Sequence, residues 1–201
     1  MPFDSRYTRR VLLNGALVVS GAFIGSANPL RALAQGSSPT PECKDADDPT
    51  EEQIEGPFFK PRSPQRSDLT EPASRAKIVT LEGMVLTRSC RPVPGALLDL
   101  WHADENGDYD NSGFRYRGHV NADASGRYSF RTNLPGLYPG RTRHYHLKVQ
   151  APQRPILTTQ LYFPDEARNL QDSFFSDALL VRYADAPAGT AARFDFILDI
   201  A

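Results

Sequence analysis

Four residues between positions 109 and 146 have the chemistry and the spacing of a metal site. His144 and His146 are two positions apart, so on a strand both side chains lie on the same face, roughly 6.6 Å apart at the backbone. Both imidazoles could then bind one ion at about 2.1 Å. Tyr109 and Tyr138 lie in glycine-containing turns upstream of the pair. Together these four side chains are the candidate metal ligands.

The surroundings of the histidine pair favour tyrosine as the remaining type of ligand. Residues 147–150, directly after the pair, include no acid, whereas cupin sites and 2-His-1-carboxylate iron(II) sites need one nearby. His102, beside Trp101, and His119 are expected to be structural. A phenol with an ordinary pKa near 10 ionises at neutral pH only beside a strong positive charge, which a trivalent ion supplies. Two tyrosinates and two neutral imidazoles therefore suit Fe(III), one per chain.

Short apolar runs separated by turn residues predict the strands that would position these ligands. The 201 residues include 17 prolines and 14 glycines, which argues against a helical bundle, and the length fits one domain of ordinary size. Turns recurring about every 8 to 12 residues predict an all-β fold, a β-sandwich of two sheets with long connecting loops. The expected strands are residues 78–87, 96–103, 114–122, 127–132, 143–150, 158–163 and 194–200.

Residues 1–34 have the pattern of a twin-arginine signal peptide. Arg9 and Arg10 precede an apolar run over residues 11–24, which is too short and too rich in small and polar residues for a membrane span. An A-x-A motif at residues 32–34 predicts cleavage directly after it. Signals of this type are recognised by an export receptor, and the resemblance implies export of a folded protein to the periplasm or beyond. The alternative is an uncleaved helix that anchors the chain.

Two further segments complete the expected organisation. Residues 35–76 form an extended N-terminal segment, in which residues 56–59 (Gly-Pro-Phe-Phe) are expected to be pinned to the core. Its second half, residues 60–76, is long for a loop without regular structure, which indicates a functional loop or a lid. Residues 77–201 are expected to form the β-sandwich domain.

Charge and cysteine content narrow the choice of partners and compartment. The formal net charge is −1 and no basic patch is present, so nothing indicates nucleic acid as a partner. Cleavage after residue 34 would leave 19 basic and 23 acidic residues, a net charge of −4, and no membrane contact. Cys43 and Cys90 are the only cysteines, and in an oxidising compartment they favour a disulfide over two unpaired thiols.

Several motifs resemble those of the intradiol ring-cleavage dioxygenases, which cleave catechols and protocatechuate. In chain order, the motifs are IEGPFF (54–59), LDLWHADENGDY (98–109), NADASGRYSFRT (121–132), PGLYPGRTRHYHLKV (135–149) and TTQLYF (158–163). The resemblance covers about residues 50–170, and two tyrosines with HxH in a PGxYP context are highly specific. It implies a β-sandwich with a non-haem Fe(III) held by Tyr109, Tyr138, His144 and His146.

The resemblance also implies a reaction and further site residues. A catechol-type aromatic diol would react with O2 to give a cis,cis-muconate-type diacid. Tyr138 would be the axial ligand that the substrate displaces, and it would take up a substrate proton. Arg141, three residues before His144, matches an arginine that faces the bound substrate and would stabilise developing negative charge. Gln160, 14 residues after His146, matches a pocket glutamine that would orient the oxygens.

The chain also departs from the family's pattern. It is expected to lack the helical dimerisation domain that precedes the sandwich in the cytoplasmic catechol enzymes, its expected export is atypical of the family, and it resembles a smaller, exported branch. The short connection from Tyr138 to His144 is expected to leave the pocket more open. These departures leave the physiological catechol and the oligomeric state open.

Two other hypotheses fit parts of the sequence. Transthyretin-like and regulatory β-sandwich modules, which bind partners or sugars without catalysis, have similar motifs at Gly83-x-Val85, Pro94-Gly95-Ala96, Asp123-x-x-Gly126-x-Tyr128-x-Phe130 and Pro135-Gly136. On that hypothesis HxH is a pair of surface residues, and the tyrosines serve packing at turns. A different metal oxygenase or a metal-binding module is the second hypothesis. The two tyrosines together with HxH favour the dioxygenase, because a binding module has no need of them.

Overall fold

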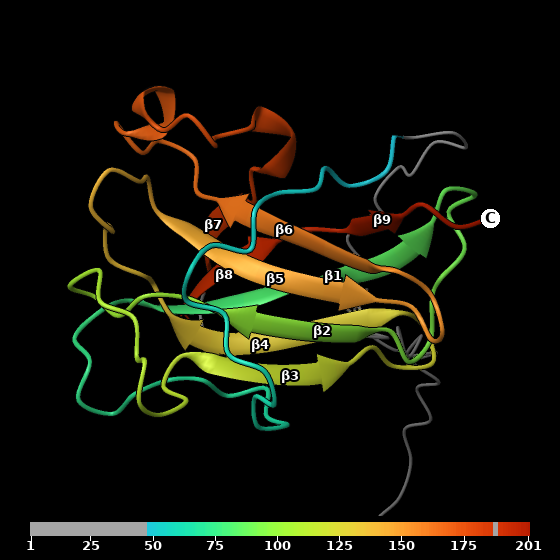
Figure 1. Ribbon diagram of the computed structural model, residues 1–201, viewed down its shortest axis with the longest axis horizontal. Coiled ribbons are helices and arrows are strands. Elements are labelled where there is room, and N and C mark those ends of the chain that lie inside the picture. The colour runs from blue at the N-terminus through green and yellow to red at the C-terminus, as the bar shows by residue number, and fades with distance from the viewer. Residues whose placement is uncertain (1–47, 187–188) are drawn as a thin grey trace, which may run out of the picture. The chain divides into compact units, whose positions relative to one another are not determined.

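Two β-sheets pack face to face around a shared apolar core (Figure 1). The structure is a computed structural model that describes residues 48–186 and 189–201. One sheet has the strand order β3-β2-β5-β6, with β2 (Leu97–Trp101), β3 (Arg117–Asn121), β5 (His144–Gln150) and β6 (Ile156–Tyr162). The other has the order β4-β1-β8-β7 with β9 also on β1, and comprises β1 (Ile78–Thr87), β4 (Arg127–Asn133), β7 (Arg182–Ala186), β8 (Gly189–Arg193) and β9 (Phe196–Leu198).

The core forms because alternate residues of each strand point between the sheets. Leu98 and Leu100 of β2 and Leu147 and Val149 of β5 are fully buried there, together with residues of β1 and β4 from the facing sheet. Each such side chain is worth about 1.5–3 kcal/mol on burial. The intervening residues of β5, which include His144 and His146, therefore lie on the outer face of the four-stranded sheet.

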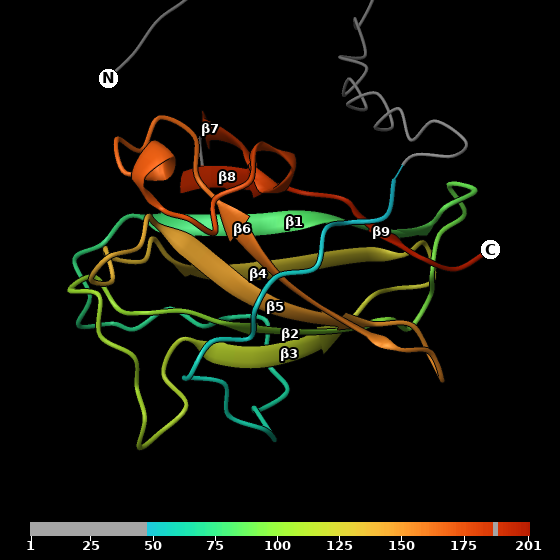
Figure 2. The ribbon, with the colours of Figure 1, turned by 45° about the horizontal axis from the view of Figure 1, so that its top comes forward.

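The expected all-β sandwich is confirmed, and each expected strand contains or overlaps an observed one. The strand expected at 114–122 begins only at Arg117, because residues 114–117 form a turn in which the Arg117 N–H bonds to the Phe114 carbonyl at 3.3 Å. The last expected strand shortens to β9. The hairpin of β7 and β8, which lies beside β1 in Figure 2, was not predicted, because the inward residues of β8 are Thr190 and Ala192 and give little apolar signal.

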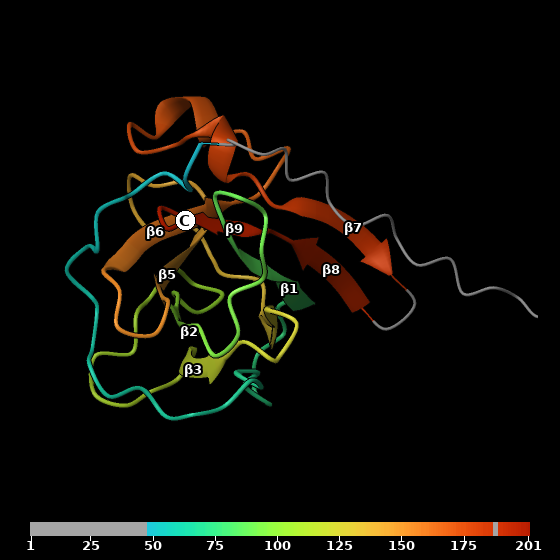
Figure 3. The ribbon, with the colours of Figure 1, turned by 90° about the vertical axis from the view of Figure 1, so that its right-hand side faces the viewer.

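Most of the described part of the N-terminal segment runs outside the four-stranded sheet (Figure 3), and residues 67–69 then pair with Arg131 of β4. It is fixed to that sheet by backbone hydrogen bonds, from Gln53 N to Thr158 O at 2.8 Å and between residues 64–66 and His119 of β3. The outer face of this sheet is therefore covered by chain that comes from far away in the sequence. No helix among the described residues has the length and apolar character needed to cross a membrane.

Other sequence-based expectations fall partly or wholly outside the described residues. The twin-arginine pattern and the cleavage motif lie in residues 1–34, which the structure does not describe. Cys90 is disulfide-bonded. Cys43, the only other cysteine, also lies outside the described residues.

Candidate metal centre and active site

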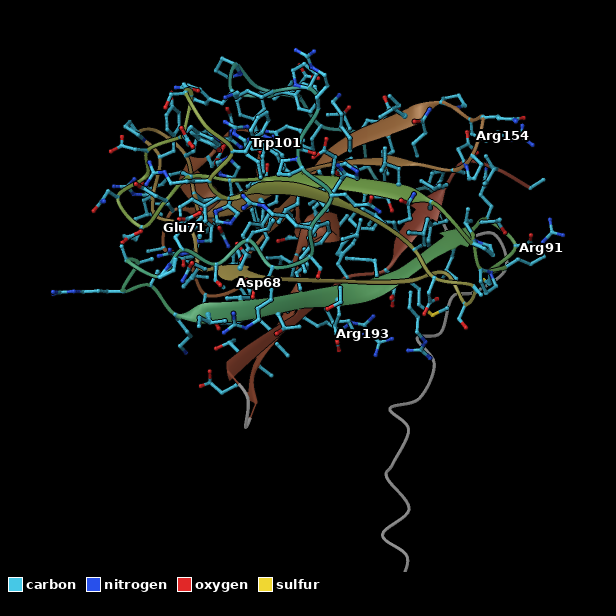
Figure 4. All side chains as sticks on the ribbon, turned by 90° about the horizontal axis from the view of Figure 1, so that it is seen from below. Asp68, Glu71, Arg91, Trp101, Arg154 and Arg193 are labelled. Atoms are coloured by element: carbon cyan, nitrogen blue, oxygen red, sulfur yellow. The ribbon has the colours of Figure 1, made fainter. Side chains whose placement is uncertain are left out.

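The candidate site lies on the outer face of the four-stranded sheet. Strand register places Trp101 of β2 and Gln160 of β6 on either side of His146, and Tyr162 opposite His144. In Figure 4, Trp101 lies on the side of this sheet that faces away from β1. The indole ring stacks on the His146 imidazole at 5.0 Å between centroids and 8° between planes. The pairing of the strands thus places the two histidines of β5 beside Trp101, Gln160 and Tyr162 on the outer face of the sheet.

Two loops bring Tyr109 and Tyr138 to the two histidines. Tyr109 follows a turn after β2, and Tyr138 lies in the connection between β4 and β5. The loops touch backbone to backbone, with a bond from Gly136 N to Asp104 O at 2.7 Å. A Cβ at Gly107 would lie 2.4 Å from the Leu137 carbonyl oxygen, so glycine is required there for the loops to approach.

The candidate ligand atoms of three of the four residues lie close together. His144 Nε2 lies 3.1 Å from His146 Nε2 and 3.3 Å from the Tyr109 hydroxyl. The Thr142 carbonyl lies 2.7 Å from His144 Nδ1 and can only accept, so Nδ1 carries the proton and Nε2 presents its lone pair to the site. The Tyr138 ring lies 5.9 Å from the Tyr109 ring and is half-buried beside the site.

Burial sets the charge of these groups. It lowers the pKa of His144 to about 4 and that of His146 well below its ordinary value, so both imidazoles are neutral at pH 7 and could bind a metal ion. Burial also raises the pKa of Tyr109, so this phenol ionises only where a strong cation stabilises the phenolate. No three His, Cys, Asp or Glu side chains of the described residues form a metal-binding group. The donor set that is present, phenol oxygens with neutral imidazoles, fits a hard trivalent ion such as Fe(III).

A small cavity of about 170 Å³ opens onto these groups. Its lining combines the candidate residues Tyr109, Tyr138, Arg141, His144 and His146 with Ile54, Gly56, Pro57, Phe58 and Phe174. The Phe58 ring stacks on the Tyr109 ring, with 4.4 Å between centroids. The covering N-terminal segment therefore supplies an apolar wall for a flat, small ligand next to the convergent polar atoms.

Arg141 lines the cavity but is already strongly bound. Its Nε lies 2.8 Å and 3.0 Å from the two carboxylate oxygens of Asp172, and its Nη2 donates to Gln160 Oε1 at 2.6 Å. The guanidinium lies 4.7 Å from the centroid of the Phe174 ring. Gln160 is fully buried and is not among the residues that line the cavity; it also donates to the Ile54 carbonyl at 3.0 Å. The structure thus places Gln160 against Arg141.

The other two histidines make structural contacts. His102 lies 2.7 Å from both the Ala103 carbonyl and the Thr132 hydroxyl, and burial lowers its pKa to about 3. His119 Nδ1 lies 3.1 Å from the Ser63 hydroxyl, where the N-terminal segment meets β3. Both contacts match the structural role expected for these residues.

Two residues that support the site could not be identified from the sequence pattern. Arg117 is almost fully buried and donates to the carbonyls of Phe58 at 2.7 Å and Asp110 at 3.2 Å, so it joins the covering segment to the loop of Tyr109. Asp172 lies in the loop after β6, within a polar stretch with no periodicity. Because both act through long-range contacts, only the fold reveals them.

Comparisons with known proteins place the chain in a family. A protein-family model described as "Dioxygenase" matches residues 54–199. A hydroxyquinol 1,2-dioxygenase of Nocardioides simplex is 29% identical over 168 residues, which are 71% of this chain and 57% of that protein. This chain therefore spans little more than half of that relative's length.

Solved structures show the same fold. The dioxygenase domain of a dioxygenase carbohydrate-binding protein fusion from Streptomyces sp. SirexAA-E is 52% identical, with a TM-score of 0.74, and the match covers 77% of this chain and all of that one. A hydroxyquinol 1,2-dioxygenase from Pseudomonas putida DLL-E4 is 25% identical, with a TM-score of 0.70 and 77% and 68% coverage. The chain belongs to the intradiol ring-cleavage dioxygenase family.

Proposed function

We propose that this protein is an Fe(III)-dependent dioxygenase that cleaves a catechol-type aromatic diol between its two hydroxylated carbons. Both atoms of O2 would enter the product, a cis,cis-muconate-type diacid. The observation that carries the proposal is the convergence of Tyr109, His144 and His146 at a small cavity that Tyr138 and Arg141 also line. The family model and the names of the relatives, hydroxyquinol, catechol and chlorocatechol 1,2-dioxygenases, support it.

Different residues of the site would bind the iron, accept a proton from the diol and hold its aromatic ring. Tyr109, Tyr138, His144 and His146 would hold one Fe(III), which supplies Lewis acidity toward the diol. The Tyr109 hydroxyl lies against His144 and its ring stacks on Phe58, so Tyr138 would be the ligand better placed to yield to the diol and to take up one of its protons. The apolar wall around Phe58 would hold the aromatic ring and exclude water.

Arg141 would act through its charge rather than by binding the iron. Its guanidinium lines the cavity, where negative charge develops as the ring is oxidised, and a fixed cation there lowers the energy of the transition state. Gln160 lies against Arg141, so its proposed role is to orient that guanidinium. Of the described residues that line the cavity, Arg141 is the only cation, and Asp172 already pairs with it. This pairing favours an uncharged catechol over a carboxylated one.

Oxygen uptake together with metal analysis tests the proposal. We expect close to one ferric iron per chain, a visible tyrosinate-to-iron band, and O2 consumption with catechols that yields a muconate-type spectrum. Uptake with catechol or hydroxyquinol should exceed uptake with protocatechuate, whose carboxylate finds no unpaired cation. Stoichiometric zinc without iron and without a visible band would contradict the proposal, and a transthyretin-like module would show neither iron nor uptake.

We also propose that the protein is exported through the twin-arginine route, on the basis of the pattern in residues 1–34. Changing Arg9→Lys together with Arg10→Lys should leave the full-length precursor in the cytoplasm, because this pair is the core of the signal. Fractionation with an antibody against the folded domain measures the result, and Arg6→Lys is the matched control. Normal export and trimming of the double variant would refute the twin-arginine assignment.

A further inference from the structure

The loop between β6 and β7 places one buried carboxylate against the candidate active site. This loop, residues 163–181, carries the 3-10 helices η1 (Asn169–Gln171) and η2 (Asp177–Leu179). Asp172 directly follows η1, and its side chain is only 1% exposed. A buried carboxylate is costly unless its oxygens accept enough hydrogen bonds. The groups that donate hydrogen bonds to Asp172 therefore indicate which parts of the site this carboxylate positions.

One group of partners fixes the guanidinium of Arg141. Asp172 accepts from Arg141 Nε with both oxygens, at 2.8 Å and 3.0 Å, while Gln160 accepts from Nη2. The Phe174 ring packs on the guanidinium, and the Phe174 N–H donates to Asp172 Oδ1 at 3.0 Å. The carboxylate thus sets the position of the cation and of the ring beside it.

A second partner leads toward a candidate metal ligand. The Thr142 N–H donates to Asp172 Oδ2 at 2.8 Å, and the Thr142 hydroxyl donates to Asn169 Oδ1 at 2.7 Å. The Thr142 carbonyl in turn accepts the proton of His144 Nδ1. The same loop therefore holds the backbone that orients His144.

We propose that Asp172 is a positioning residue for ring cleavage, which acts by holding the Arg141 guanidinium at the cavity; this inference rests on the proposed function. An electrostatic group contributes to catalysis only when its charge is fixed where charge develops. Each oxygen of Asp172 accepts from Arg141 Nε and from one backbone N–H, that of Phe174 or that of Thr142. In Asp172→Asn the amide nitrogen therefore faces Arg141 Nε–H and a backbone N–H whichever oxygen it replaces. Two N–H donors then point at an amide that also donates, so the guanidinium loses its fixed orientation.

A double-mutant cycle tests the inference. Asp172→Asn should lower kcat by roughly 10- to 100-fold, the usual cost of losing a residue that orients a site group, with KM little changed. In an Arg141→Ala background the same change should lower kcat no further, because its target is gone. Iron content and the visible band should survive in each variant. Asp177→Asn, an exposed carboxylate of the same loop, is the matched control and should keep wild-type turnover.

If Asp172→Asn does not fold, the same measurements are made on Asp172→Glu, because this variant keeps the negative charge but moves the carboxylate. Its kcat should fall with iron retained, and the fall should again vanish without Arg141. Equal losses of kcat with and without Arg141, or unchanged kcat in the single variant, overturn the role of Asp172. A wild-type protein that consumes no O2 with any catechol overturns the proposed function as well, so the two failures are distinguishable.

Discussion

His146→Ala is expected to leave the protein without iron, colourless and inactive on catechols. The imidazole is buried between the Trp101 ring and Gly56, and its Nε2 is one of the three convergent ligand atoms. Its loss removes one neutral candidate ligand from β5 and leaves two of the three convergent atoms. Because a catalytic metal supplies several kcal/mol of transition-state stabilisation, turnover should drop by roughly 10³-fold or more.

Iron content per chain, the visible spectrum and O2 uptake measure this result. His119→Ala is the matched control, because His119 lies on the same outer face but contacts Ser63 of the covering segment rather than the cavity. That variant should keep its iron and colour. A His146→Ala protein that retains a stoichiometric ferric iron and the band would show that the ion binds elsewhere.

The histidine pair was predictable because its geometry is local. The strand period of two places His144 and His146 on one face whatever the rest of the fold does, and the apolar residues between and after them give the direction of the core. The glycines around Tyr109 and Tyr138 indicate turns for the same local reason. What the sequence does not contain is the distance between the two turns, which depends on the close backbone contact at Gly107.

The supporting residues were not predictable, because their roles depend on long-range packing. Asp172 lies 31 residues after Arg141, in a loop whose only regular structure is two short 3-10 turns. Arg117 is one of several arginines in the sequence, and only the register of β3 buries it beneath the covering segment. The resemblance indicated Gln160 as a pocket residue, and the fold places it against Arg141. Local patterns thus predict the ligands, and the tertiary fold determines what orients them.

The N-terminal segment that covers the site shows how a local sequence pattern and the tertiary fold act together. Gly56 has a φ of +74°, and a Cβ there would lie 3.3 Å from His146 Cε1, so glycine allows the segment to lie directly on the His146 ring. Two residues later Phe58 stacks on Tyr109, and the Phe58 carbonyl accepts from buried Arg117. The motif that resembled the family at residues 54–59 therefore has a physical role as the wall of the cavity.

Arg141→Ala is expected to lower the chemical step by roughly 10²- to 10³-fold while iron and colour survive, the usual cost of losing one aligned group at a developing charge. Arg141 supplies no ligand atom, and the substrate should still chelate the iron. The change also leaves the Asp172 carboxylate buried without its cation, which destabilises the fold by about 3–5 kcal/mol. Thermal unfolding must therefore be measured beside single-turnover rates.

The double variant Arg141→Ala/Asp172→Asn separates the two effects. It removes the stranded charge, so the melting temperature should recover toward wild type while kcat stays at the level of Arg141→Ala. Arg168→Ala, an exposed arginine of the β6–β7 loop, should change neither quantity. Full turnover in Arg141→Ala would exclude an electrostatic role for Arg141. Loss of iron would instead assign it a structural role, because its neighbour Thr142 holds the ring of His144 by a hydrogen bond.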